Sequence, residues 1–301
     1  MARGENHLDT DISLVTNPSA IGSLAMPSMM HAPPPFSWHH LNLWHLNWWP
    51  CLLLVVGQVL YFGLARREVW PKVRYACWTG GLVVTFLATQ SVIGFYDMAM
   101  FSDHMIQHLL LIMVAAPLLA YAAPLDLVRH RGPGWLRRFL DSAPATALLS
   151  PLAAFIIYAA IIPATHLTSF FNVMMNNEWV HHSEQILFLL VGYLFVRQAF
   201  AIEEDCSLNP GLRLMCVMVA VPVDTITGLA LNMTNFNPFP SYNVMGSRSV
   251  IMDSIHLGGS IMWIGGDALM LLACIPVATY WVREETRRTK ILDAQLDAQG
   301  L

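Results

Sequence analysis

The sequence has 301 residues, of which 55% are hydrophobic and only 12% charged, and its mean hydropathy is +0.50. This composition leaves too little polar surface to cover a soluble globular protein of this size, so an integral membrane protein is predicted. The net charge of −4 and the lack of a basic patch, a phosphate-binding loop or a nucleophile elbow disfavour nucleic-acid-binding and hydrolase functions.

Seven apolar stretches approach the roughly 20 residues that a helix needs to cross a bilayer. They are long, almost uncharged and rich in Leu, Val and Ala, which predicts an all-α bundle of seven transmembrane helices. We place these helices near residues 48–65, 77–96, 102–123, 145–162, 182–201, 214–231 and 257–281.

The basic residues are distributed unevenly among the connections between these stretches. Fourteen of the sixteen follow the first, third and fifth stretches or lie in the C-terminal tail, whereas Arg3 and Arg248 fall on the other side. The positive-inside rule therefore predicts an N-terminus outside the cell and a cytoplasmic C-terminus. The expected parts are an extracytoplasmic arm at 1–47, a membrane domain at 48–281 and a cytoplasmic tail at 282–301.

The N-terminal arm lacks a positively charged segment followed by an apolar core, so no cleavable signal peptide is expected. Tryptophans at positions 38, 44, 48 and 49 fit an aromatic belt in the headgroup layer. The alternative is a copper-collecting arm that uses thioethers and imidazoles. The residues available for that purpose are Met26, Met29, Met30, His31, His39, His40 and His45.

The third stretch opens with the most informative motif of the chain, Phe101 to His108. In a helix His104 and His108 lie on one face, one turn apart, so that both imidazoles can hold one metal ion. The alternative is that the pair only caps the wet end of a membrane helix. In either case we expect that removing these side chains takes away no core packing.

Further candidate ligands and acidic groups follow in the later stretches. At the start of the fifth, His181 shares a helical face with Glu184 and Gln185, as ligands or as ordinary polar residues of a first turn. The seventh opens with Asp253 and His256. Asp224 and Asp267 are expected inside the membrane, where an ionisable side chain normally faces the bundle interior and marks function.

Histidine and methionine gather on the predicted outer side. Eleven of the twelve histidines lie there, all except His130, and many methionines share that side, which is the ligand mixture suited to copper. The five cysteines contain no C-x-x-C pair, and four of them map to the cytoplasmic half, where thiols stay reduced. No disulfide and no thiolate metal site is therefore expected.

Four further stretches, taken in order, carry a recognisable pattern. They are Leu60-Tyr61 with Trp70-Pro71-Lys72-Val73-Arg74, His104-Met105-Ile106-Gln107-His108-Leu109-Leu110-Leu111, Phe188-Leu189-Leu190-Val191-Gly192-Tyr193-Leu194-Phe195, and Asp253 with Gly259 and Met262-Trp263. Together they run from about residue 41 to 281 and resemble the CtaG-type family of bacterial cytochrome c oxidase assembly factors. Two positions depart from the family pattern: Gln185 stands where a second histidine is expected, and Asp224 where many relatives carry a histidine.

The resemblance implies a non-catalytic, multi-pass protein of the bacterial plasma membrane that helps copper enter the CuB centre of the oxidase catalytic subunit. Its partners would be that subunit, an extracytoplasmic copper donor and membrane lipid. The family pattern carries over His104, His108 and Asp253. The hypothesis is a transient copper site with His104 and His108 at its core, completed by Asp253, His256 or His181.

Two other classes of function stay open. A haem-binding redox protein would need an axial histidine from each of two helices, whereas the clear pair lies on one helix, and a strong Soret absorption band would identify it. A membrane copper transporter is suggested by Asp224 and Asp267, although no inverted repeat is evident, and copper flux into sealed vesicles would identify it.

Overall fold

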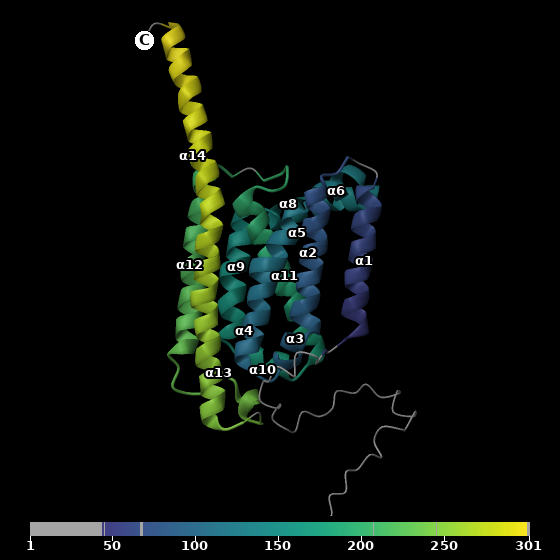
Figure 1. Cartoon of the computed structure of the whole chain (residues 1–301), viewed down its shortest axis with the longest axis vertical. Coiled ribbons are helices and arrows are strands. Elements are labelled where there is room, and N and C mark those ends of the chain that lie inside the picture. The colour runs from purple at the N-terminus through teal and green to yellow at the C-terminus, as the bar shows by residue number, and fades with distance from the viewer. Residues whose placement is uncertain (1–43, 45, 67–68, 207, 245, 300–301) are drawn as a thin grey trace, which may run out of the picture.

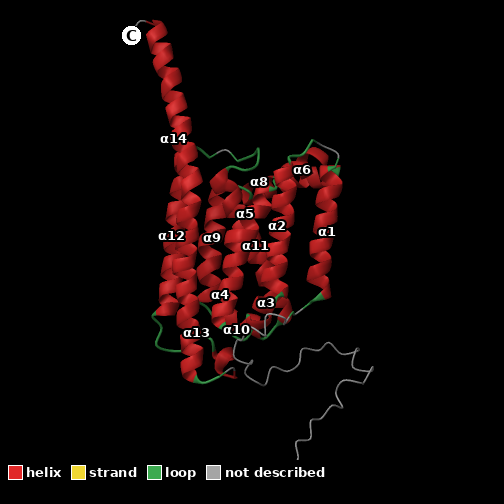
Figure 2. Ribbon diagram, in the orientation of Figure 1, coloured by secondary structure: helices red, strands yellow, loops and turns green. Residues whose placement is uncertain are grey.

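A computed structural model gives the arrangement of the chain and describes residues 44, 46–66, 69–206, 208–244 and 246–299. The Met- and His-containing part of the N-terminal arm, Met26 to His40 with His45, lies outside these residues. Every regular element that the described residues form is a helix, as predicted (Figure 2).

The helices follow one another as a bundle with short surface helices at its ends (Figure 1). In chain order they are α1 (Trp48–Ala65), α2 (Lys72–Gln90), α3 (Val92–Tyr96), α4 (Phe101–Leu110), the π-helix η4 (Leu111–Ala115), α5 (Ala116–Tyr121), α6 (Pro124–Arg131), α7 (Gly134–Leu140), α8 (Ala143–Leu148), α9 (Pro151–His166), α10 (Phe170–Met175), α11 (Glu178–Phe200), α12 (Pro210–Asn232), the 3-10 helix η5 (Pro240–Val244), α13 (Arg248–Ser260), the π-helix η6 (Ile261–Gly265) and α14 (Gly266–Gln299).

Five helical stretches among the described residues are long and apolar enough to cross a membrane, which indicates a membrane protein. Helix α9 is apolar but has only 16 residues, and α11 has 23 residues but begins with charged and polar side chains. A count of seven crossings and the direction of the termini stay predictions. The five stretches are Trp48–Ala65, Lys72–Tyr96, Phe101–Arg131, Pro210–Asn232 and Arg248–Ile291.

Helix α11 is central to the bundle and packs against η4, α5 and α9. Helix α11 approaches η4 and α5 closely at Gly192. A Cβ at this position would lie 2.9 Å from the Ala116 Cβ and 3.0 Å from the Ile112 Cα. Phe188 and Tyr158 are fully buried in the core between these helices. This packing holds η4 and α5 against α11, and α11 in turn against α9.

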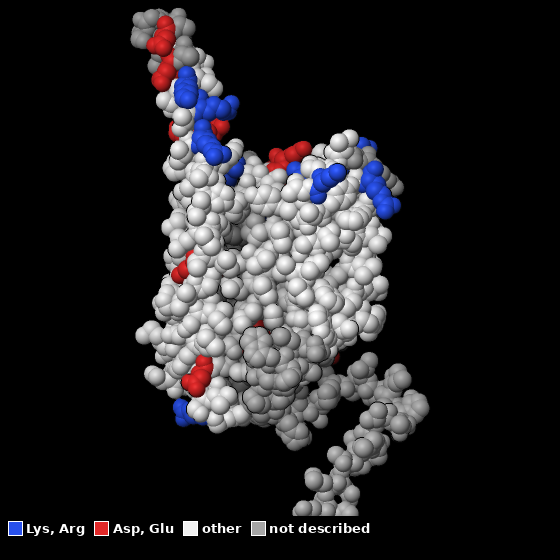
Figure 3. All heavy atoms as spheres, viewed as in Figure 1, with Lys and Arg blue, Asp and Glu red and all other residues white. Residues whose placement is uncertain are grey.

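Lys and Arg side chains gather at the end of the bundle where α6 lies and along the projecting part of α14, and few lie at the opposite end (Figure 3). The start of α4 and helix α10 are at that opposite end (Figure 1). The asymmetry agrees with the distribution from which the cytoplasmic side was predicted.

Arg197 anchors the α6 end of the bundle through a buried ion-pair network. Its guanidinium is fully buried, contacts the Glu203 carboxylate at 2.6 Å, donates to the Leu149 carbonyl at 3.0 Å and also pairs with Asp205. Burial raises the pKa of the Asp205 carboxyl, but hydrogen bonds from Arg129 and Arg197 and their charges outweigh it and lower the pKa below its usual value. The network ties the segment after α11 to α6.

Replacing Arg197 by methionine should lower the free energy of unfolding by about 3–5 kcal/mol, because Glu203 would be left as a buried charge without its partner. Thermal unfolding of the purified protein in detergent measures the loss. The double variant Arg197→Met/Glu203→Gln should recover part of it, since the carboxylate is then absent. A single variant as stable as the wild type would contradict a structural role for this network.

Candidate metal site

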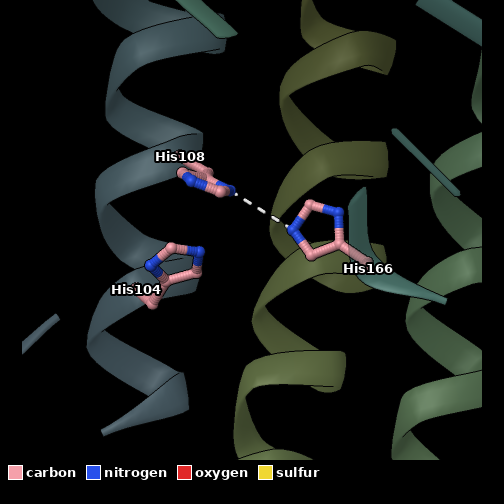
Figure 4. A group of neighbouring side chains, drawn as sticks. All are labelled: His104, His108 and His166. Atoms are coloured by element: carbon pink, nitrogen blue, oxygen red, sulfur yellow. Dashed lines mark hydrogen bonds between the residues drawn. The ribbon is translucent and has the colours of Figure 1, made fainter. Parts of the chain in front are cut away.

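Two histidines of α4 form one wall of a buried cluster. His104 and His108 lie one helical turn apart, as their spacing predicts, with ring centroids separated by 4.1 Å, and both point away from the α4 axis toward His166 (Figure 4). They are 0% and 4% exposed. The expectation that they sit at the wet end of the helix is therefore wrong, because α9, α11 and Phe171 enclose them.

Helix α9 contributes His166 from its last turn. The Nε2 atom of His166 lies 3.2 Å from Nδ1 of His108 (Figure 4), and its Nδ1 faces the Ile162 carbonyl oxygen at 2.8 Å. That carbonyl accepts a hydrogen bond from Nδ1–H, so Nε2 of His166 carries the lone pair, which faces Nδ1 of His108. His166 thus presents a ligand atom toward the α4 pair.

The first turns of α11 contribute His181 and Glu184. The Oε2 atom of Glu184 lies 3.8 Å from Nε2 of His104 and 3.9 Å from Nε2 of His108. His181 contacts the Asp97 carboxylate at 3.0 Å, and the same carboxylate accepts a hydrogen bond of 2.6 Å from Gln107. A carboxylate of this kind commonly orients a ligating histidine from behind.

Several polar atoms of the cluster are buried without any hydrogen-bond partner in the described part of the chain. They are both ring nitrogens of His104, Nε2 of His108 and both carboxylate oxygens of Glu184. Each buried, unsatisfied group of this type costs about 1–3 kcal/mol, and more when charged. A cation placed among them would satisfy Nε2 of His108, the Glu184 carboxylate and the one ring nitrogen of His104 that carries a lone pair, and the carboxylate supplies a compensating negative charge.

The donor atoms form two overlapping groups, and within each group they lie within 4.8 Å of one another. One consists of His104, His108 and His166, and the other of His104, His181 and Glu184. Imidazole nitrogens with one carboxylate suit copper, zinc, iron or nickel, and the donors alone do not select among these metals. His104 belongs to both groups, so the two sets of donors share this residue.

The structure brings together only some of the residues expected from the sequence. His104, His108 and His181 share the cluster, whereas Asp253 and His256 lie on α13 and belong to neither group. The Asp253 side chain is exposed, and Nε2 of His256 lies 2.9 Å from the Thr234 carbonyl oxygen.

Sequence reasoning missed His166 and Asp97 and treated Glu184 only as one possibility. His166 follows a uniformly apolar helix, and Asp97 precedes α4 by four residues. One sequence feature could have identified both residues: each is a polar residue at the predicted outer end of an apolar stretch. Which of these polar ends face one another depends on the packing of α11 against η4 and α5 and of α9 against α11.

The two intramembrane carboxylates lie near each other where α12 meets α14. Asp224 is 4% exposed and accepts a hydrogen bond of 2.6 Å from the Tyr158 hydroxyl. Asp267 is half-buried and accepts one of 2.7 Å from Thr225. Gly266 packs beside Asp224, since a Cβ there would lie 3.4 Å from its Oδ2 atom. Asp224 therefore faces the bundle interior.

Relatives of this chain occur in mycobacteria. Uncharacterized proteins of Mycobacterium bovis and Mycobacterium tuberculosis are each 28% identical over 266 residues, which is 82% of this chain and 40% of theirs. One of Mycobacterium leprae is 28% identical over 254 residues, covering 78% of this chain and 38% of its own length. The chain thus spans about two fifths of the length of these relatives. No solved structure matches it.

The family comparison covers most of the membrane domain. The sequence model of the family described as cytochrome c oxidase caa3 assembly factor (Caa3_CtaG) matches residues 59–284, a range that includes every residue of the histidine cluster and both intramembrane carboxylates. The chain belongs to this family of cytochrome c oxidase assembly factors.

Proposed function

We infer that the chain holds copper transiently and assists its insertion at the CuB centre of the oxidase catalytic subunit. The observation that carries this inference is the set of buried donor atoms on His104, His108 and Glu184 that have no hydrogen-bond partner in the described chain. The assembly-factor family and the buried imidazole and carboxylate donors support the same step, delivery of a metal.

The geometry suits an ion in transit better than a fixed structural ion. Two overlapping groups of three donors share His104, and neither is a closed set of four ligands like that of a structural zinc site. An ion held by three ligands keeps an open position at which an acceptor can attack. The function proposed is delivery without catalysis.

The partners follow from this role. The acceptor is the oxidase catalytic subunit, and an extracytoplasmic donor supplies the copper. The start of α4 and helix α10 lie at the end of the bundle opposite most of the basic residues (Figures 1 and 3). With the predicted topology, we propose that the site lies in the outer half of the bacterial plasma membrane.

Comparing the oxidase in cells with and without this gene tests the proposal. The oxidase of the deletion strain should keep its haem absorption bands but lose copper and activity, and a plasmid copy of the gene should restore both. Normal copper content in the deletion strain, or an equal loss of haem and copper, would contradict delivery of copper to CuB.

A copper transporter is the second candidate, favoured by the buried carboxylate of Asp224. Sealed vesicles that contain the purified protein distinguish the two functions. A delivery factor should bind copper without accumulating it in the vesicle lumen, whereas a transporter should accumulate it at a rate set by the number of protein copies.

A further inference from the structure

A small cavity lies directly beside the histidine cluster, deeper in the bundle. Its volume is about 30 Å³, enough for one or two water-sized occupants. His108 and His166 line its side toward the cluster, and Asp224 lines it as well. The two histidines therefore belong both to the cluster and to this cavity.

Three methionines line the same cavity: Met105 of α4, Met113 of η4 and Met262 of η6. Two of them come from the π-helical turns, each of which interrupts an α-helix. Such turns are rare and occur frequently at functional sites, because the inserted residue changes the direction of the side chains around it. Both π-helical turns of the described chain thus contribute a methionine to the lining of this cavity.

The charge in the cavity is a single carboxylate. The Tyr158 hydroxyl donates to Asp224 at 2.6 Å, and neither Lys nor Arg is among the described residues that line the cavity. A carboxylate in such surroundings needs a proton or a cation. A monovalent cation would bring the cavity to neutrality.

We propose that this cavity is a second position for Cu(I), held by methionine thioethers with Asp224 as its counter-charge and reached from the histidine cluster through His108 and His166. Thioethers are soft, neutral ligands that select Cu(I) over hard divalent cations. This inference rests on the proposed function, because it takes the ion to be copper. It adds a second binding position for that ion, deeper in the bundle than the histidine cluster.

Titration of the purified full-length protein with Cu(I), in competition with a coloured Cu(I) chelator under reducing conditions, tests the second position. The wild type should hold two Cu(I) ions, and Met113→Leu/Met262→Leu should hold one, because leucine keeps the volume but removes the sulfur. Asp224→Asn should weaken the second ion by about 10-fold or more. Met218→Leu, on the exposed surface of α12, is the matched control and should keep both ions.

X-ray absorption at the copper edge gives an independent readout. Wild-type protein loaded with two ions should show nitrogen and sulfur neighbours, and the double methionine variant only the nitrogen shell. One ion with no sulfur neighbour in the wild type would overturn the second position and leave the histidine site intact. The wild type could instead bind two ions with sulfur neighbours while deletion of the gene leaves the copper content of the oxidase unchanged. That result would contradict the proposed delivery function and leave the second copper position intact.

Discussion

Cells that carry His104→Leu should assemble a cytochrome c oxidase that contains haem but lacks copper at CuB, with copper content reduced to that of the deletion strain. His104 belongs to both donor groups, so its loss leaves two ligands in each. Two neutral or singly charged ligands cannot compete for a scarce ion against other cellular sites. The copper-to-haem ratio of the purified oxidase measures the effect.

Variants of the other histidines test whether the loss of oxidase copper comes from the loss of metal ligands. His181→Leu removes a ligand of one group, and His166→Leu one of the other. Each should therefore lower oxidase copper less than His104→Leu does. His256→Leu is the matched control, since this histidine lies outside both groups. Oxidase copper that depends on His256 but not on His104 would reverse the assignment.

The choice of leucine follows from burial. His104 is 0% exposed, and the ring of His108 stacks on Phe188 with centroids 3.9 Å apart. Alanine at these positions would leave cavities that destabilise the bundle by a few kcal/mol, contrary to the expectation that no packing is lost. Leucine has a similar volume, so the amount of protein in the membrane should stay near that of the wild type.

The features of the fold and the site that depend on the spacing of residues within one segment can be predicted from the sequence. His104 and His108 share a face because they are four residues apart in one helix, and the apolar stretches give the helical bundle. The inward direction of Asp224 follows from the high free energy of a charge that faces lipid. Each of these inferences uses only one segment of the chain.

The remaining site residues depend on tertiary packing. Glu184 and His166 reach the α4 pair because α11 packs against η4 and α5, which continue α4, and α9 packs against α11. The approach at Gly192 is visible only in the assembled bundle. Likewise, η4 and η6 follow no periodicity in the sequence, yet they bring Met113 and Met262 to one cavity. Asp253 has the right residue type, but it occupies the exposed side of α13.

Glu184→Gln should change copper affinity and stability in opposite directions. Gln keeps the shape of the side chain but removes the only negative charge in the two donor groups, so the affinity for copper should fall by about 10–100-fold. In the metal-free protein the same change removes a buried carboxylate that has no hydrogen-bond partner in the described chain, so the free energy of unfolding should stay equal or rise. A residue kept for binding at the expense of stability behaves in this way.

Glu203→Gln is the matched control for that prediction, because it makes the same chemical change at the other end of the bundle. Glu203 is 3% exposed and pairs with Arg197 at 2.6 Å, so this variant should lower the thermal unfolding temperature and leave copper affinity unchanged. Chelator competition and thermal unfolding, both in detergent, measure the two quantities for each variant. Glu184→Gln could instead lose stability as Glu203→Gln does and keep its copper affinity. Glu184 would then be a structural residue, and its carboxylate would not be a ligand of the metal site.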